Sequence, residues 1–192
     1  MSLKQEDRRI RKTKKLLKES LIELMNEKKV KDITIKDITE RADLNRGTFY
    51  LHYLDIYDLL SQIEDEIITN LTALLKTFNE TQTLSSYELL EQLFNYLYEN
   101  KEIFRVLLYT NSDTQFLNKL QTLIKTMGLY TLQNVYKDSQ PIVYTYFLSF
   151  ISSGVIGMVE HWFENGMTLT PSEMASMVDQ MITKSAENFM ST

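Results

Sequence analysis

The sequence has no cysteine, and residues that interrupt helices are scarce, with two prolines and five glycines among 192 residues. Without cysteine the chain can build no disulfide framework, no zinc site with thiolate ligands and no cysteine nucleophile. This composition fits the reducing cytoplasm, where disulfides are rare. The few prolines and glycines indicate long uninterrupted elements.

Histidine is also scarce, with only His52 and His161. The two are far apart in the sequence, so neither a two-histidine metal site nor a Ser-His-Asp triad has a spacing in its favour. A glycine-rich phosphate loop and the His-Glu-x-x-His pattern are both absent from the sequence. We therefore expect no enzyme, no metal site and no cofactor.

A targeting or membrane segment is not expected either. The N-terminus is charged rather than apolar, and no apolar run approaches the roughly 20 residues of a membrane span. We expect a soluble cytoplasmic protein without a membrane partner.

Positive charge is unevenly distributed along the chain, whose net charge is -5. Residues 1–53 hold 14 Lys and Arg against 9 Asp and Glu, whereas the remainder holds 7 against 17. A basic end on an acidic protein orients its approach to a polyanion such as DNA. The alternative is that the basic run from Arg8 to Lys18 is only a solvated helix face.

The stretch from residue 34 to 53, TIKDITERADLNRGTFYLHY, predicts two short helices joined by a tight turn. The first has apolar residues at i, i+3 and i+7 on one face, namely Ile35, Ile38 and Ala42. Thr34 and Asp37 have the spacing of a capping box, which starts this helix.

The second short helix begins at Asn45, whose side chain can accept hydrogen bonds from the amides of the first turn. Only Asp43 and Leu44 separate it from the first helix, so the two helices must cross steeply. This is the helix-turn-helix arrangement, in which the second helix enters a DNA major groove. A simple helical hairpin shares this spacing and is the alternative.

The rest of the chain has helical periodicity without an alternating strand pattern, which predicts an all-α fold. The helix from 55 to 78 has the longest such pattern; it is expected to be a stiff rod, or simply a scaffold. We expect a break over 79–86 and a loop over 137–140. The other helices are predicted at 7–26, 85–99, 103–109, from 112 or 113 to about 136, at 141–166 and from 170 onward.

Residues 12–60 resemble the DNA-binding signature of the TetR family of bacterial transcriptional regulators. The matching positions are Gly47, Thr48, Phe49, Tyr50, His52 and Tyr53. One position departs from the family, because Ile56 stands where a lysine usually helps the next helix to hold a phosphate. The segment 144–174 also resembles the C-terminal domain of TetR-like regulators from low-GC Gram-positive bacteria.

The resemblance implies a set of DNA-binding residues: Thr34, Lys36, Asn45, Arg46, Gly47, Thr48, Tyr50, Leu51 and His52. Among these, Arg46 is placed to read guanine, Asn45 adenine and Leu51 a thymine methyl group. Thr48, Tyr50 and His52 match the positions that contact phosphates in the family. Thr34 and Lys36 could hold a further phosphate through amide, hydroxyl and charge.

The last two predicted helices have a broad apolar surface that can be buried inside the chain or against a second copy. The second arrangement gives a four-helix interface with two-fold symmetry, and the resemblance favours it. The residues expected in this dimer interface are Phe150, Ile151, Val155, Met158, Trp162, Met174, Met177 and Met181.

Aromatic residues are frequent in the C-terminal part, and most of them are expected in the core. Some could instead line a cavity for an apolar or aromatic small molecule. The candidates are Phe104, Tyr109, Phe116, Tyr130, Tyr144, Phe147 and His161.

Together these features predict a DNA-binding domain, 1–54, and a ligand-binding and dimerisation domain, 55–192. The expected function is that of a homodimeric repressor that binds a near-palindromic operator on double-stranded DNA and is released by a small-molecule effector. The alternatives are an activator or coactivator, or a protein-interaction module of the same fold that has lost operator binding.

Overall fold

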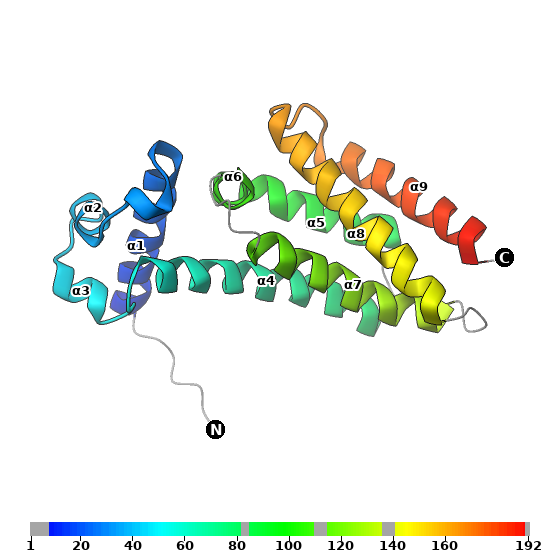
Figure 1. The fold of residues 1–192 in the computed structure, drawn as a ribbon, viewed down its shortest axis with the longest axis horizontal. Coiled ribbons are helices and arrows are strands. Elements are labelled where there is room, and N and C mark those ends of the chain that lie inside the picture. Colours follow the sequence, from blue (N-terminus) through cyan, green and yellow to red (C-terminus); the bar gives the residue numbers. More distant parts are fainter. Residues whose placement is uncertain (1–7, 82–84, 110–114, 136–140, 191–192) are drawn as a thin grey trace, which may run out of the picture. The chain divides into compact units, whose positions relative to one another are not determined.

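The computed structural model describes residues 8–81, 85–109, 115–135 and 141–190, and within these ranges every regular element is a helix. The predicted all-α fold is therefore confirmed. Figure 1 shows the elements in order: α1 (Arg8–Glu27), the short 3-10 helix η1 (Val30–Asp32), α2 (Ile35–Arg41), α3 (Arg46–Tyr50), α4 (Ile56–Thr81), α5 (Ser86–Glu99), α6 (Lys101–Tyr109), α7 (Gln115–Val135), α8 (Pro141–Glu164) and α9 (Pro171–Met190).

The helix boundaries lie within three residues of those predicted from the sequence. The predicted capping box starts α2 at Thr34, and a second capping box at Ser85 starts α5, where a helix was expected from 85. The break expected over 79–86 is wrong in its first part, because α4 continues through Thr81. The expected helix start at 112 or 113 and the loop 137–140 lie outside the described residues.

The chain divides into two compact units. The first comprises residues up to Glu66 together with 105–112, and the second comprises 67–104 and the residues from Asp113. The division crosses α4, so part of this helix belongs to the unit that carries α1 to α3. The expected domain boundary after residue 54 stays a prediction.

The core of the first unit is built on α1. Its apolar stripe of Leu17, Leu21, Leu24 and Met25 is buried, and α2 packs against α1 and α3. Ile38 of α2 and Phe49 of α3 have no exposed surface, whereas Ile35 and Leu44 are half-buried. None of these short helices could bury an apolar face by itself, so packing rather than local propensity holds them in place.

In the second unit, α5 packs along α9 and α7 packs along α8. Polar contacts tie α5 to α9: the Ser86 hydroxyl donates to Asp179 at 2.5 Å, and the hydroxyls of Tyr87 and Ser172 lie 2.7 Å apart. The α7–α8 contact depends on Gly128, because a side chain there would overlap the buried Leu148.

Candidate nucleic-acid interface

The start of α2 is fixed to the end of α1 by a single carboxylate. Asp37 accepts hydrogen bonds from the Thr34 amide at 2.8 Å and from the Lys28 ammonium at 2.7 Å, and its own amide donates to the Thr34 hydroxyl. The Lys28 contact, with help from Thr34, lowers the pKa of Asp37 to about 2. The carboxylate is therefore charged at neutral pH, and it neutralises the positive end of α2.

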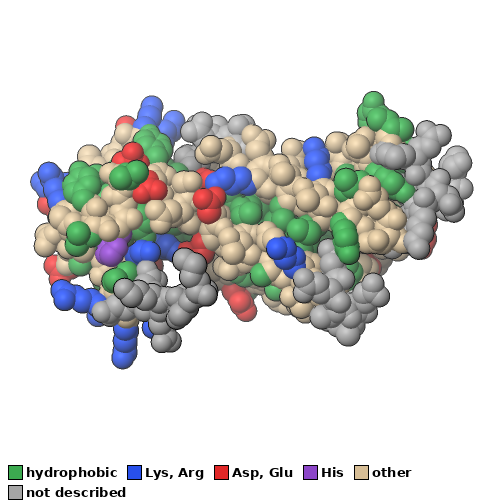
Figure 2. Space-filling model, turned by 90° about the horizontal axis from the view of Figure 1, so that it is seen from below, with side chains coloured by type: hydrophobic (Ala, Val, Ile, Leu, Met, Phe, Trp, Pro, Cys, Tyr) green, Lys and Arg blue, Asp and Glu red, His purple; other side chains and the backbone are tan. Residues whose placement is uncertain are grey.

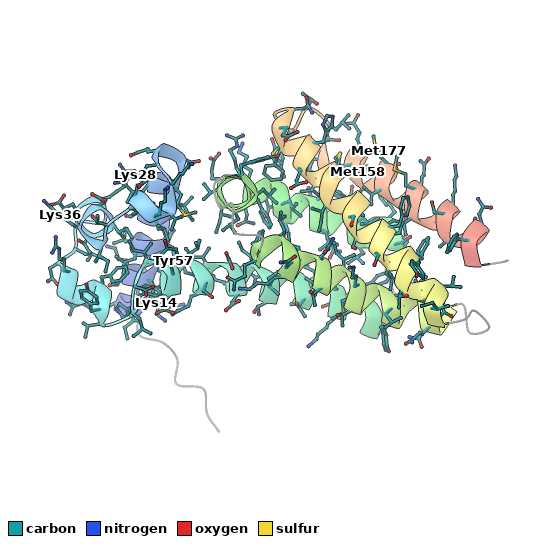
Figure 3. All side chains as sticks on the ribbon, viewed as in Figure 1. Lys14, Lys28, Lys36, Tyr57, Met158 and Met177 are labelled. Carbon is teal, nitrogen blue, oxygen red and sulfur yellow. The ribbon has the colours of Figure 1, made fainter. Side chains whose placement is uncertain are left out.

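This geometry narrows what the start of α2 can offer to a phosphate. Because the Thr34 amide already donates to Asp37, Thr34 retains only its hydroxyl proton. Lys36 is exposed and projects away from α2, 3.6 Å from Glu40 (Figure 3). The predicted phosphate contact could use the Thr34 hydroxyl and the Lys36 charge, but not the Thr34 amide.

The turn between α2 and α3 sets the direction of α3. Asp43 has a φ of 53°, in the left-handed region that Asp tolerates better than most residues. The Leu44 amide then donates to the Thr39 carbonyl at 2.9 Å, which closes the turn onto α2. The brief connection read from the sequence thus produces the expected helix-turn-helix.

One side of α3 is buried and the other faces solvent. Phe49 is 0% exposed, and its ring contacts Tyr50 and Tyr53 at centroid distances of 5.7 Å. Leu51 is 80% exposed. Of the predicted DNA-binding residues of this helix and its ends, Thr48 and His52 are half-buried, and the exposed ones are Asn45, Arg46, Gly47, Tyr50 and Leu51.

Asn45 does not have the freedom that the sequence suggested. Its side-chain oxygen accepts from the Thr48 amide at 2.8 Å and from the Thr48 hydroxyl at 3.1 Å. A bidentate contact to adenine needs both the oxygen and the amide nitrogen. With the oxygen engaged as the cap of α3, only the amide nitrogen can donate to DNA, so the expected adenine contact does not fit this conformation.

Basic residues outnumber acidic ones in the first 53 positions, 14 to 9. Figure 2 shows lysine and arginine side chains on the surface of the first unit, with carboxylates among them. Some basic residues are paired inside the unit: the Arg41 guanidinium donates to Glu27 at 2.7 and 3.1 Å, and this contact lowers the pKa of Glu27. Arg46, at the first position of α3, is exposed.

The predicted dimer residues of the second unit fall into three groups, exposed, buried and half-buried. Phe150 is 69% exposed, and Met177 and Met181 are exposed on α9. In contrast, Ile151, Trp162 and Met174 are buried within one chain, so they belong to its core rather than to a free surface. Trp162 donates to the Leu169 carbonyl at 2.8 Å, which holds the loop between α8 and α9.

The other two dimer candidates, Val155 and Met158, are half-buried on α8, and Figure 3 labels Met158 and Met177. Gly154 and Gly157 are exposed, and a side chain at either would meet no neighbouring atom within 4 Å. An exposed apolar face therefore runs along α8 and α9; its large members are Ile142, Tyr146, Phe150, Met177, Met181 and Phe189.

Within the described residues, the predicted ligand contacts divide between the core, the exposed surface and one groove. Phe104 and Phe116 are buried with ring centroids 6.2 Å apart, and they fill the core. Tyr109, Tyr130 and His161 are exposed.

The last two ligand candidates, Tyr144 and Phe147, lie in a buried cluster with Leu148 and Ile151. Phe147 also borders an open groove of about 590 Å³ between α8 and α9. The other lining residues were not among the predicted ligand contacts: Tyr146, Phe150, Ser185, Asn188 and Phe189. Their helical spacing on α8 and α9 could have suggested it.

Comparison with known families matches residues 85–184 to TetR_C_8, a transcriptional regulator C-terminal region. The match covers more than half of the 192 residues. The chain belongs to the TetR family of transcriptional regulators. The resemblance to the TetR family is thus confirmed, and TetR-type proteins are regulators of transcription rather than enzymes.

Individual relatives agree with this assignment. An uncharacterised HTH-type regulator of Bacillus subtilis, YxbF, is 26% identical over 96 residues, which are 48% of this chain and 25% of that protein. The match thus spans about a quarter of that relative's length.

Two solved structures share the fold. A TetR regulator from Streptococcus agalactiae matches with a TM-score of 0.68 at 23% identity, covering 92% of this chain and 96% of that one. The B. subtilis regulator FadR, solved with stearoyl-CoA, matches with a TM-score of 0.68 at 14% identity, covering 88% and 96%.

One helix of this TetR protein corrects an expectation about membranes. Within the described residues, Ile142–Glu164 of α8 is long and apolar enough to cross a membrane. Its most apolar 18-residue stretch has a mean hydropathy of 1.7, and 28% of that stretch is buried. The expectation that no apolar run approaches that length is wrong. TetR-type regulators are soluble DNA-binding proteins, and here α8 packs along α7 and presents its remaining apolar side chains beside α9.

Proposed function

We propose that this chain is a homodimeric, cytoplasmic repressor whose two α3 helices bind a near-palindromic operator. The observation that carries the proposal is the arrangement of α3, a short helix held from behind by fully buried Phe49, with Arg46 and Leu51 exposed on its outer side. A helix so placed can enter a major groove and bring these side chains to base edges.

Arg46 is the residue proposed to provide most of the sequence preference. It is exposed at the first position of α3, and an arginine in the groove can bind guanine through two hydrogen bonds. Leu51 offers an apolar contact for a thymine methyl group, and the Asn45 amide nitrogen offers a single donor.

The test is binding to the DNA upstream of the protein's own gene, compared with a scrambled duplex of the same composition. We expect a preference for the upstream DNA and steep weakening with salt, because phosphate contacts release counterions. Arg46→Ala should lose about 1 to 3 kcal/mol of the preference for the upstream DNA. Its affinity for the scrambled duplex should fall only by the small amount expected for the loss of one positive charge. An unchanged preference would refute the role of Arg46, and salt-independent binding would refute the DNA-binding proposal itself.

Homodimer formation is supported by the apolar face of α8 and α9. A face with Tyr146, Phe150 and Met181 exposed would be costly to leave in water, and two copies can bury it against each other around a two-fold axis. Two copies would also give two α3 helices, which a near-palindromic operator requires. Light scattering of the purified protein should give the dimer mass.

An apolar small molecule is proposed as the effector. Two observations support it: the aromatic groove between α8 and α9, and the fold shared with FadR, which was solved with stearoyl-CoA. The effector would favour a conformation of the dimer in which the spacing of the two α3 helices does not match the two operator half-sites. Its binding would shift the population of dimers toward that conformation and so release the operator. Stearoyl-CoA is the first probe, and release of bound operator at a saturable concentration is the expected result; release by detergent at the same concentration would argue against a specific site.

A further inference from the structure

The start of α4 is occupied by two carboxylates of its own. Asp55 accepts a hydrogen bond from the Asp58 amide at 2.8 Å, and Asp58 accepts one from the Leu54 amide at 2.8 Å. Gln62 donates to the second oxygen of Asp58 at 3.0 Å. The Leu54 and Gln62 contacts lower the pKa of Asp58, so this carboxylate is charged at neutral pH. The amides that an anion would need are thus partly used inside the chain.

The sequence around these two carboxylates contains no lysine or arginine. Between Arg46 and Lys76 it has neither, but it has five acidic residues: Asp55, Asp58, Glu64, Asp65 and Glu66. Of these, Glu64 is buried and Glu66 accepts a hydrogen bond from Lys18 of α1. The charge at the start of α4 is therefore that of Asp55 and Asp58 alone. Two large apolar side chains beside them in the sequence are exposed, Leu54 at 82% and Tyr57 at 57%, and Figure 3 labels Tyr57. The start of α4 therefore presents negative charge and apolar surface, which is the opposite of a phosphate-binding end.

Chain length brings this end of α4 to the DNA backbone if α3 lies in the groove. Asp55 lies four positions after Leu51, and a chain extends at most about 3.5 Å per residue, so the two are at most about 14 Å apart. The major groove is only about 12 Å wide, with phosphates along both edges. An element so close to a residue in the groove can therefore reach one of those edges.

We propose that the start of α4 opposes DNA binding, with the carboxylates of Asp55 and Asp58 repelling the backbone beside the groove that α3 enters. The proposal rests on the proposed DNA-binding function. It adds an affinity-determining element to it: Asp55 and Asp58 weaken binding to every DNA sequence, whereas Arg46 selects among sequences. When the protein binds DNA more weakly, an effector needs a smaller preference for the DNA-free form to release the protein from the operator.

The test uses Asp55→Asn in the full-length protein, because asparagine caps a helix as well as aspartate does and removes only the charge. The matched control is Glu99→Gln, which makes the same change of net charge in the second unit, at the exposed end of α5. Both proteins and the wild type are titrated against the labelled upstream duplex and the scrambled duplex. Thermal unfolding checks that Asp55→Asn leaves the fold intact.

We expect Asp55→Asn to bind both duplexes about threefold to tenfold tighter than wild type, the range that Coulomb's law gives for one like charge removed from beside a phosphate in water. The gain should shrink with added salt, since screening shortens the reach of the charge. Glu99→Gln should bind like wild type.

Equal or weaker binding by Asp55→Asn would overturn the proposal, as would an equal gain from Glu99→Gln. The proposed function fails separately, if the wild type does not prefer the upstream duplex. In that case the scrambled duplex at low salt still decides the role of Asp55. If neither wild type nor Asp55→Asn binds any duplex at low salt, both proposals fall, and the apolar surface at Leu54 and Tyr57 would instead fit a protein partner.

Discussion

Asn45 connects the stability of α3 with its contact to DNA, and substitutions can separate the two. Its side-chain oxygen satisfies the Thr48 amide at 2.8 Å, and its amide nitrogen is the part available to DNA. Asn45→Ala removes both groups. Asn45→Ser keeps an oxygen that can cap α3 and removes the amide nitrogen, so it is the matched control.

The expected magnitude follows from the length and exposure of α3. The helix has five residues, Arg46–Tyr50, so losing its cap leaves the first turn without its only side-chain acceptor for an amide. Loss of such a cap costs about 0.5 to 2 kcal/mol. Because Asn45 is exposed, water can reach the Thr48 amide, and we expect about 1 kcal/mol for Asn45→Ala. Asn45→Ser should stay within a few tenths of a kcal/mol of wild type.

Urea unfolding measures how much the Asn45 cap contributes to stability, and titration of the upstream duplex measures how much its amide nitrogen contributes to DNA affinity. Asn45→Ala should lose both stability and DNA affinity, and Asn45→Ser should lose affinity alone. If Asn45→Ser is as unstable as Asn45→Ala, the hydrogen bond to Thr48 is not what holds α3. If both variants bind DNA as tightly as wild type, the Asn45 amide does not contact DNA.

Three other predictions follow from single contacts. Gly128→Ala should destabilise the second unit by up to about 2 kcal/mol in urea unfolding: overlap of its methyl group with buried Leu148 costs about 1 to 3 kcal/mol, and the higher helix propensity of alanine offsets about 1 kcal/mol; an unchanged midpoint would mean that the Leu148 side chain can move aside. Phe150→Glu should shift the mass in light scattering from dimer to monomer while leaving the helical circular dichroism unchanged; a persistent dimer would exclude this face as the interface. Asp37, whose pKa is lowered from 3.8 to about 2, should stabilise the first unit fully above pH 3.8 and lose that effect as pH falls through about 2. Asp37→Asn should therefore lose less stability than wild type over this pH range, and equal losses would show that another group titrates.

The helix-turn-helix could be predicted from local signals because each of them acts within a few residues. The Thr34–Asp37 capping box, the cap at Asn45 and the short turn at Asp43 and Leu44 each involve neighbours in the chain, and the structure contains all three. The predicted roles of these residues toward DNA stay predictions, apart from the Asn45 oxygen and the Thr34 amide, which are engaged inside the chain.

Which apolar residues lie in the core and which on the surface could not be predicted from such local signals. Phe150 and Ile151 are adjacent and both apolar, yet one is 69% exposed and the other is buried. Helical periodicity gives the faces of α8 but does not say which face α7 covers, and that depends on contacts between residues about 20 positions apart, such as Gly128 and Leu148.

By itself, the sequence determined the all-α class, the helix-turn-helix and the concentration of basic residues in the first 53 positions, because helical periodicity, caps and charge are local properties. The tertiary structure alone decided which atoms remain free to act. It placed Trp162 and Met174 in the core, left Phe150 and Met181 on a bare face, and committed the Asn45 oxygen and the Asp55 and Asp58 carboxylates to caps. Burial and hydrogen bonding depend on which elements meet in space, and the order of residues along one helix does not contain that information.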